Sequence, residues 1–429
     1  MARMNSATSG GFQAEPEQQF DPARVPGNPA LQHLARARGV LLLQGPVGPF
    51  FDRLTRWLIG CGAAVHRVAF QPGDVRDCRA CSPIRFGGNA AEWPGFFDAL
   101  VDQFGIDTVV LFGQSRKHHS AALERARARG VAAIVLEEGY VRPGFVTMEF
   151  DGVNALSRTL DRYEWDPFAP GPVVKTRRPA STRGQFWYMA GYACRHYWAQ
   201  HWDEPLSKTY RHHRSTDVWQ HTRYWLWSWT RKHLHLLGDK IAASRLRKAP
   251  YFFVPLQHEG DSQITHHSPY PQITAFISEV IDSFARHAPT GTRLVFKIHP
   301  HSRGGPSYSQ QIAKQAARHG VRGRVVHLVE GHTPTLVEHA RGVVLINSTV
   351  GLQALARNKP VAVLGDAVYK RPGLYFDGPL DRFWTESCPP DHECARDFLQ
   401  QLIALTQVHC NVYGRASEPL LWTAERGPM

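Results

Sequence analysis

The sequence of 429 residues has no apolar run of the roughly 18–20 residues that a membrane-crossing helix needs. Its N-terminal segment has no apolar core of the kind that secretory leaders carry, since it is polar and rich in Gly, Pro, Gln and Glu. We therefore expect residues 1–35 to form a disordered tail on a cytoplasmic protein that is either soluble or peripheral to a membrane.

Cysteine is also scarce. The chain has seven, scattered between Cys61 and Cys410, and this odd number argues against a disulfide framework and for a reducing compartment. Cys78 and Cys81 form a lone C-x-x-C with no second pair at zinc spacing, so we expect no metal. The Gly-rich stretch 45–49 matches neither a dinucleotide fingerprint nor a Walker A loop, and its prolines lack N–H donors for phosphate. This excludes P-loop ATPase and kinase chemistry, and we expect no cofactor.

Positive charge, by contrast, is abundant. Lys and Arg exceed Asp and Glu by 13, which predicts an anionic partner: a nucleotide donor, nucleic acid or an acidic membrane. No nucleic-acid-binding module is recognisable, so we do not expect nucleic acid. Basic residues scattered for solubility are the alternative explanation.

Short apolar runs ending at Gly, Pro or polar residues alternate with helical patterns, and this alternation predicts parallel α/β sheets. It occupies residues 36–180 and restarts after residue 250, which predicts two Rossmann-like domains, 36–180 and 249–429, facing a cleft. The predicted strands are 39–43, 63–68, 108–112, 131–136, 251–256, 293–298, 324–328, 342–346 and 360–365.

The intervening segment 181–248 has a different composition. It holds seven of the twelve tryptophans, and twelve Lys/Arg against four Asp/Glu. Few Gly or Pro interrupt it, so we expect a helical insert. Its aromatic rings either contact a membrane or pack the two domains together.

Polar residues just beyond strands are the first candidates for a site, because ligands of open α/β sheets bind there. The loop Gln257–Gln263 places Glu259 and Asp261 directly after a strand, where a carboxylate serves as nucleophile, base or metal ligand. Glu137 and Glu138 end another strand and offer a general acid or base. A solvated loop and a surface turn are the respective alternatives.

Two further strand ends carry groups suited to a phosphate: a Lys and a His-Pro pair at one, and an amide with two hydroxyls before a helix at the other. Simple capping of that helix is the alternative for the hydroxyls. The residues are Lys297, His299 and Pro300, and Asn347, Ser348 and Thr349.

Taken together, these motifs resemble the capsule polysaccharide biosynthesis family, and within it the single-module KpsS/LipB type of β-Kdo transferase rather than the two-module KpsC type. Each run is short, but their order and spacing cover about residues 40–375. The matching runs are 43–51, 137–143, 147–149, 152–154, 257–263, 297–300 and 347–351.

The resemblance implies a GT-B-like fold and transfer of Kdo from CMP-Kdo, with retention, onto a phosphatidylglycerol-type lipid that starts the poly-Kdo linker of a capsule. Asp261 would be the nucleophile, and Glu137 or Glu138 the acid/base. The Glu-Glu pair departs from the Glu-Asp expected of two-module relatives, which leaves open which acid acts.

By the same resemblance, the CMP group would be held by His-Pro and Ser/Thr motifs, as in bacterial sialyltransferases. The implied donor-binding residues are Lys297, His299, Pro300, Asn347, Ser348, Thr349, Gln257 and Gln263. Candidate substrate contacts are Gln44, Gly45, Arg142 and Asn154.

The implied partners are the CMP-sugar donor, an anionic phospholipid acceptor, and other capsule biosynthesis and export proteins. The implied location is the inner face of the bacterial inner membrane. A transferase of the same fold with CMP-sialic acid or an NDP-sugar, and a non-catalytic capsule assembly or export factor, remain the alternatives.

Overall fold

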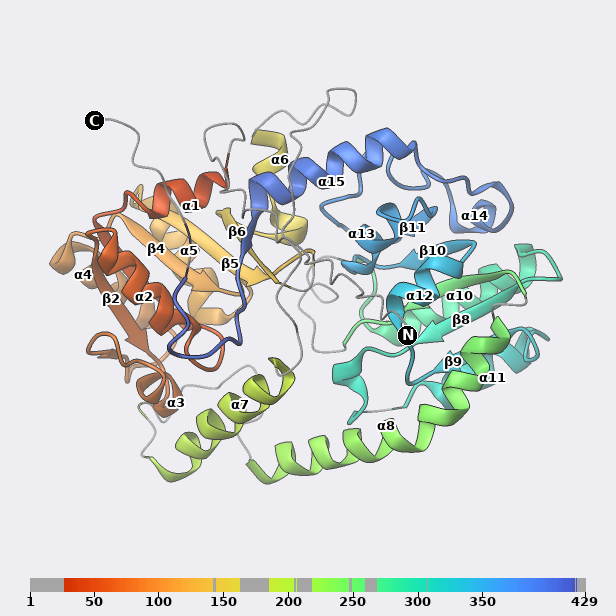
Figure 1. The fold of residues 1–429 in the computed structure, drawn as a ribbon, viewed down its shortest axis with the longest axis horizontal. Coiled ribbons are helices and arrows are strands. Elements are labelled where there is room, and N and C mark those ends of the chain that lie inside the picture. The colour runs from red at the N-terminus through yellow and green to blue at the C-terminus, as the bar shows by residue number, and fades with distance from the viewer. Residues whose placement is uncertain are drawn as a thin grey trace, which may run out of the picture.

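The computed structural model describes residues 27–141, 144–162, 185–203, 206, 218–246, 249–258, 268–305, 307–420 and 422. It has two α/β domains side by side, with two helices running along the lower edge of both (Figure 1). The predicted fold class, α/β with two Rossmann-like domains in a GT-B-like arrangement, is confirmed.

The first domain is built on a seven-stranded sheet of order β12-β6-β5-β4-β1-β2-β3. Its continuous apolar strands are buried on both faces because helices cover both sides, as parallel sheets require. The strands are β1 (Gly39–Leu42), β2 (Ala64–Ala69), β3 (Ile84–Arg85), β4 (Thr108–Phe112), β5 (Ala132–Glu138), β6 (Phe145–Phe150) and β12 (Gln407–His409). The helices are α1 (Pro29–Leu34), α2 (Phe50–Gly60), α3 (Pro72–Arg76), α4 (Trp93–Phe104), α5 (Lys117–Ala128) and α6 (Thr159–Arg162), with a 3₁₀ turn at Asn154–Leu156.

The second domain has a five-stranded, wholly parallel sheet of order β11-β10-β7-β8-β9. Its strands are β7 (Tyr251–Pro255), β8 (Arg293–Lys297), β9 (Val325–Leu328), β10 (Gly342–Leu345) and β11 (Val361–Val363). Its helices are α10 (Ile273–His287), α11 (Ser309–Arg318), α12 (Thr333–His339), α13 (Val350–Leu355), α14 (Leu380–Glu386) and α15 (His392–Thr406), with a 3₁₀ turn at Pro300–Ser302.

Both sheets repeat one topology. In each, the five parallel strands taken in chain order lie as 3-2-1-4-5, the order of doubly wound nucleotide-binding folds. In such a sheet the strand order reverses between its first and fourth strands, and the crevice for a ligand opens beyond their carboxyl ends. These switch points lie between β1 and β4 in the first domain and between β7 and β10 in the second.

The chain end corrects one predicted boundary. Helix α15 crosses from the second domain to α1, α6 and β6, and β12 then pairs antiparallel with β6 of the first sheet. Val408, Cys410 and Trp422 lie in the core of the first domain. The second domain therefore ends before Gln407, because the described residues from Gln407 to Leu420, and Trp422, belong to the first.

The N-terminal boundary also moves. Residues 1–26 of the predicted tail lie outside the described residues, but α1 is folded: the Asn28 side chain caps it by accepting from Leu31 N at 2.9 Å. Ala30 and Leu34 are buried in the core of the first domain. The folded part thus begins before residue 36.

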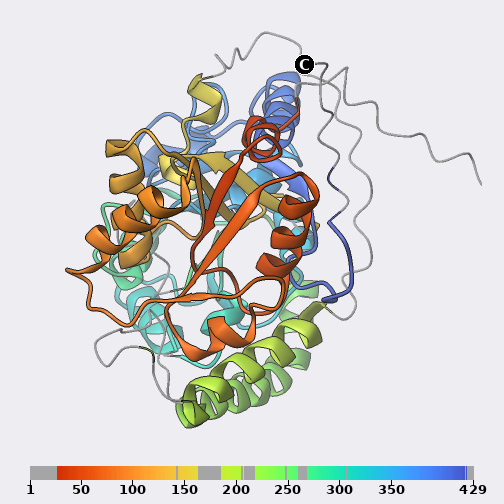
Figure 2. The ribbon, with the colours of Figure 1, turned by 90° about the vertical axis from the view of Figure 1, so that its left-hand side faces the viewer.

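The insert is helical wherever it is described, as α7 (Gln185–Trp202) and α8 (Val218–Leu246). The two helices follow one another along the lower edge of the molecule and touch where they meet (Figure 1), and Figure 2 shows both at that same edge. Asp77 of the first domain pairs with Arg195 and His196 of α7, and Asp239 of α8 accepts from Val329 N and Glu330 N of the second domain. No helix among the described residues is long and apolar enough to cross a membrane.

Candidate functional site

The carboxyl ends of β10, β7 and β8 are neighbours in the second sheet, and this brings together the residues predicted to hold a donor. Gln257 follows β7 and Asn347 follows β10, so both lie at the switch point. The Gln257 Nε2 atom donates to Asn347 Oδ1 at 2.9 Å, and both residues are buried. This amide pair ties the two strand ends together at the place where a doubly wound sheet binds its ligand.

The His-Pro motif follows β8 and is supported from outside by α8. His299 Nδ1 accepts from His301 N at 3.2 Å, and the two rings stack 5.3 Å apart. The Tyr224 hydroxyl donates to His301 O, and Arg231 donates to Arg303 O at 2.7 Å. The Trp-rich insert therefore holds the loop that carries His299.

Lys297, at the end of β8, is buried among charged groups of three segments. The neighbouring charges are the ion pair of Arg303 with Glu330, 2.5 Å between Nε and Oε1, and Asp239 of α8. Burial is the main cause that lowers the pKa of Lys297 to about 8, with Glu330 and Asp239 opposing the shift. Its ammonium is thus mostly charged at neutral pH, and it loses this charge as the pH passes through about 8.

Glu330 is a polar residue that the sequence did not single out. It follows β9, and with Asp239 and His332 it lines a groove of about 440 Å³ between α8 and α12. A weak signal for Glu330 is present in the sequence, because Glu330-Gly331 ends an apolar run just as Glu138-Gly139 does. The groove gives this domain open space at the end of β9, beside Lys297.

The Asn347–Thr349 turn leads into α13. Ser348 is committed in part to the turn: its Oγ accepts from Val350 N at 3.3 Å and its carbonyl accepts from the Tyr369 hydroxyl at 2.5 Å. Thr349 is the N-cap of α13, yet its side chain makes no capping hydrogen bond. Capping therefore explains Ser348 in part and does not explain Thr349, whose contact with a phosphate stays a prediction.

In the first domain the two acids of the Glu-Glu motif lie on opposite faces of β5. Glu138 pairs with Val146, on the face of the core that holds Leu136. Glu137 pairs with Thr147, and the Asn154 side-chain amide donates to its Oε2. The structure thus gives the two adjacent carboxylates different surroundings, and the predicted contact Asn154 belongs to Glu137.

Behind Glu137 lies a buried network that the sequence did not reveal. The Tyr140 hydroxyl donates to Glu149 Oε1 at 2.7 Å and accepts from Asn154 N at 2.5 Å. Ser157 donates to the other oxygen of Glu149. Burial raises the pKa of Glu149, and the hydrogen bonds from Ser157, Thr159 and Tyr140 offset only part of that rise.

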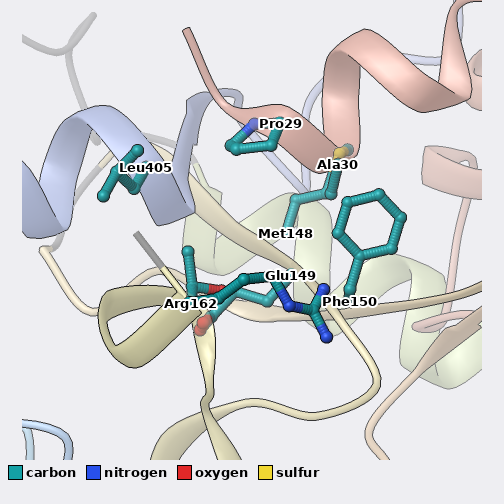
Figure 3. Close-up of a pocket in the computed structure, with 8 residues that line it drawn as sticks. Pro29, Ala30, Met148, Glu149, Phe150, Arg162 and Leu405 are labelled. Carbon is teal, nitrogen blue, oxygen red and sulfur yellow. The ribbon is translucent and has the colours of Figure 1, made fainter. Parts of the chain in front are cut away.

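The backbone of Glu149 belongs to β6, and its side chain lines a small pocket with Met148, Phe150 and Arg162 (Figure 3). Asn154 itself has a left-handed backbone, φ 58°, and Gln114 brackets the preceding residue by hydrogen bonds to both Val153 N and Val153 O. Since Gln114 follows β4, the turn that carries Asn154 is fixed from the switch point of the first sheet.

The other switch-point residue, Gln44, is fully engaged within the protein. It donates to Asp74 at 3.0 Å and accepts from Arg116 at 2.8 Å. A Cβ atom on Gly45 would lie 2.6 Å from the Phe51 ring, so the glycine allows close packing there. Both residues shape this strand end, and their contact with substrate stays a prediction.

Asp261, Gln263 and Arg142 lie outside the described residues, and so does the rest of the loop after His258. The predicted nucleophile therefore stays a prediction. In the described part of the chain, no cluster of three or more His, Cys, Asp or Glu could hold a metal ion.

Comparison with known proteins matches residues 107–413 to the sequence model of the family described as capsule polysaccharide biosynthesis protein. The chain is 35% identical over 394 residues to the capsule polysaccharide export protein KpsS of Escherichia coli, covering 90% of this chain and 99% of that one. It is 34% identical, with 90% and 94% covered, to the capsule polysaccharide modification protein LipB of Neisseria meningitidis serogroup B.

Among solved structures, the β-Kdo 2,7 transferase of Thermosulfurimonas dismutans KpsC aligns with 84% of this chain and 89% of its own, at 14% identity and a TM-score of 0.40. The family model and the two relatives together cover nearly the whole folded part. The chain belongs to the capsule polysaccharide biosynthesis protein family.

Proposed function

We propose that this protein is a retaining glycosyltransferase that moves Kdo from CMP-Kdo onto a phosphatidylglycerol-type lipid and so starts the poly-Kdo linker of a capsular polysaccharide. The observation that carries the proposal is the gathering of Gln257, His299 and Asn347–Thr349 at adjacent strand ends of the second sheet. Amides, a His and hydroxyls at a switch point suit a nucleotide phosphate.

The chemistry follows from two successive displacements. In the first, the Asp261 carboxylate attacks the anomeric carbon while its bond to the phosphate oxygen breaks, and CMP leaves. His299, Lys297 and Thr349 stabilise the charge on the departing phosphate. In the second, Glu137 removes the proton of the acceptor hydroxyl, whose oxygen displaces Asp261. Two inversions give net retention.

Intact-mass analysis after adding CMP-Kdo without acceptor tests the donor and the nucleophile together. We expect one Kdo residue on the protein, mapped to Asp261 and absent in Asp261→Ala. Glu259→Gln is the matched control, since it removes a carboxylate from the same loop, and it should keep the adduct. An Asp261→Ala variant that still turns over CMP-Kdo would overturn the assigned nucleophile.

The rival functions predict other results. A transferase with another donor would release nucleotide from CMP-sialic acid or from a UDP- or GDP-sugar and leave CMP-Kdo intact. A non-catalytic assembly or export factor would release nucleotide from none, and Asp261→Ala would still support capsule production in cells. Release from CMP-Kdo alone excludes both.

The proposed lipid acceptor is supported by the surface of the layer that α7 and α8 form. Twelve of the fourteen large apolar side chains that are exposed in the described part of the chain lie on these two helices. They include Trp187 at 76% exposure and Leu237 at 72%. Trp rings favour the headgroup zone of a bilayer, where one edge is wet and the body apolar.

Helix α8 also differs from an ordinary surface helix, because it directs polar side chains toward the protein and apolar side chains toward the outside. Its buried side chains include polar Ser228, Arg231 and Asp239, while Trp227 and Trp229 face outward. Its exposed charged residues are all basic, and each Lys or Arg near anionic lipid contributes about 1 kcal/mol. These residues are Arg223, Lys232, Lys240 and Arg245.

We infer that this layer rests on the inner leaflet of the bacterial inner membrane, where other capsule proteins would receive the product. The exposure of the tryptophans argues against the alternative that they pack the two domains together. Trp227→Ala/Trp229→Ala should lose flotation with phosphatidylglycerol vesicles while keeping CMP binding. Ile59→Ala/Leu156→Ala, which trims the two exposed apolar residues outside the layer, should float as wild type. Equal flotation of both variants would refute the docking surface.

A further inference from the structure

The loop after α3 carries two cysteines whose environment the proposed transfer reaction does not use. The Sγ atoms of Cys78 and Cys81 lie 3.6 Å apart, and the Cys78 thiol donates to Cys81 O at 3.1 Å. Both are reduced, and in the described part of the chain no third ligand completes a metal site with them. The pair is therefore left as a dithiol.

The loop is held in the shape that brings the two sulfurs together. The two residues between the cysteines, Arg79 and Ala80, each donate a backbone N–H to Asp52 Oδ1 at 2.7 Å. Asp52 is itself buried. Because one carboxylate oxygen fixes both intervening amides, the C-x-x-C is curled before any reaction takes place.

The electrostatics distinguish the two sulfurs. A hydrogen bond from Cys81 is the main cause that lowers the pKa of Cys78 to about 7, and the buried Arg67 guanidinium adds to the effect. The same hydrogen bond raises the pKa of Cys81, and burial adds to that rise. Cys78 is thus the sulfur that ionises first, and Cys81 keeps its proton, as in a dithiol poised for exchange.

We propose that Cys78 and Cys81 form a reversible thiol–disulfide exchange site that reacts with low-molecular-weight disulfides. The Cys78 thiolate attacks one sulfur of such a disulfide, the S–S bond breaks, and one thiolate leaves with a proton from solvent. Cys81 then gives up its proton and attacks Cys78, releasing the second thiol. The protein loses two electrons and two protons, and the small disulfide is reduced to two thiols.

The residue next to this cysteine pair connects the loop to α7. Asp77, which precedes Cys78, accepts from Gly48 N at 2.9 Å and pairs with Arg195 and His196 of α7. The disulfide would thus form in the segment that seats α7 on the first domain. Exchange at this loop would not require the donor or the acceptor proposed above.

The test is peptide mapping of the full-length reduced protein after incubation with oxidised glutathione and alkylation of the remaining thiols. We expect a Cys78–Cys81 link, and the exposed Cys388 alkylated as an internal control. Cys81→Ser should stop at a glutathionyl adduct on Cys78, which forms faster as pH rises through about 7. Cys78→Ser should form neither product.

The outcome that would refute the proposal is measured on the wild-type protein, so the test does not depend on whether the variants fold. Cys78 and Cys81 both alkylated under conditions that modify Cys388 would overturn it, as would a glutathionyl adduct on Cys81 in place of Cys78. Dithiothreitol should restore both thiols. A link that survives this treatment would contradict reversibility.

Discussion

The Tyr140 hydroxyl joins the buried carboxylate of Glu149, 2.7 Å away, to the backbone N–H of Asn154, 2.5 Å away. Asn154 in turn donates its side-chain amide to Glu137. One phenol therefore links a carboxyl group sealed inside the first domain to the candidate acid/base at the end of β5. Glu149 is thereby connected to Glu137 through the hydrogen bonds of Tyr140 and Asn154.

Glu149→Gln should change how stability depends on pH. Burial raises the folded pKa of Glu149 above its ordinary value of 4.5, so above that pH the folded protein keeps a proton that the unfolded chain has released. The free energy of unfolding then falls as pH rises through the folded pKa. In Glu149→Gln this contribution to the decrease in the free energy of unfolding should be absent. Urea unfolding at a series of pH values measures it.

The control for Glu149 is Glu386→Gln. Glu386 is exposed, and its hydrogen bond from Arg382 lowers its pKa below 4.5, so it does not titrate in the pH range in which Glu149 loses its proton. The Glu386→Gln curve should therefore keep the wild-type slope above pH 4.5. A wild-type slope in Glu149→Gln as well would show that Glu149 titrates normally.

The two acids of the Glu-Glu motif should separate kinetically. Glu137→Gln should lower kcat by about 10²–10⁴-fold, the usual share of general acid–base help, because it removes the carboxylate that Asn154 orients. Glu138→Gln, on the opposite face of β5, should change kcat far less. Initial rates of CMP release in the presence of acceptor give the comparison.

A second readout tells a catalytic Glu137 from a merely structural one. The first displacement needs no base, so Glu137→Gln should still accumulate the Kdo adduct on Asp261 and fail only to pass it on. A Glu137→Gln variant with wild-type kcat, beside an inactive Glu138→Gln, would reverse the assignment.

The strands that sequence could predict are those whose signal is local. All nine predicted strands are present, because each is a short, mostly apolar run that ends at a turn residue, and β1, β4, β7 and β10 are buried along their whole length. The strands β3, β6 and β12 were missed, and β3 is only two residues long. Gln407–His409 is too short to be recognised, and it becomes a strand only because α15 returns the chain to Phe145–Thr147, some 260 positions earlier.

Contacts between residues distant in sequence also explain why the buried network of Glu149 was not predicted. Thr147 and Glu149 alternate with the apolar residues Val146, Met148 and Phe150, a pattern that predicts a solvent face. That face is covered by Tyr140 and Ser157, so the glutamate is buried. Helix α8 shows the converse, since the sequence left open whether its tryptophans pack between the domains or face outward, and the structure exposes them. Burial that depends on contacts distant in sequence leaves no local pattern.

Gly351→Ala should destabilise the second domain. A Cβ atom at this position would overlap the Tyr369 ring, whose hydroxyl donates to Ser348 O at 2.5 Å. Overpacking of this kind costs about 1–3 kcal/mol, and it should also move the turn that carries Thr349 and so weaken CMP binding. Thermal unfolding and calorimetric titration with CMP measure the two effects.

Gly95→Ala is the matched control. Gly95 lies in helix α4 with nothing within 4 Å of the added Cβ, so alanine should stabilise the protein by about 0.5–1 kcal/mol and leave CMP binding unchanged. A loss of stability in both variants would show that glycine flexibility, and not the contact with Tyr369, decides the effect.

CMP binding should weaken between pH 7 and pH 9 if Lys297 contacts the phosphate. Its pKa of about 8 means that the ammonium loses its charge within this interval, and the phosphate then loses a cationic partner. The dissociation constant should rise roughly tenfold, the effect of about 1.4 kcal/mol for a charge-assisted hydrogen bond. Calorimetric titration with CMP across the interval measures it.

Lys297→Met should bind CMP about as weakly at pH 7 as the wild type does at pH 9, and its affinity should not change over the interval. Lys297→Arg keeps a charge at every pH tested, so any affinity it retains should also be independent of pH. A wild-type protein whose CMP affinity is constant from pH 7 to pH 9 would place Lys297 in the buried charge cluster with Glu330 and Asp239 only, and would leave His299 and Thr349 to hold the phosphate.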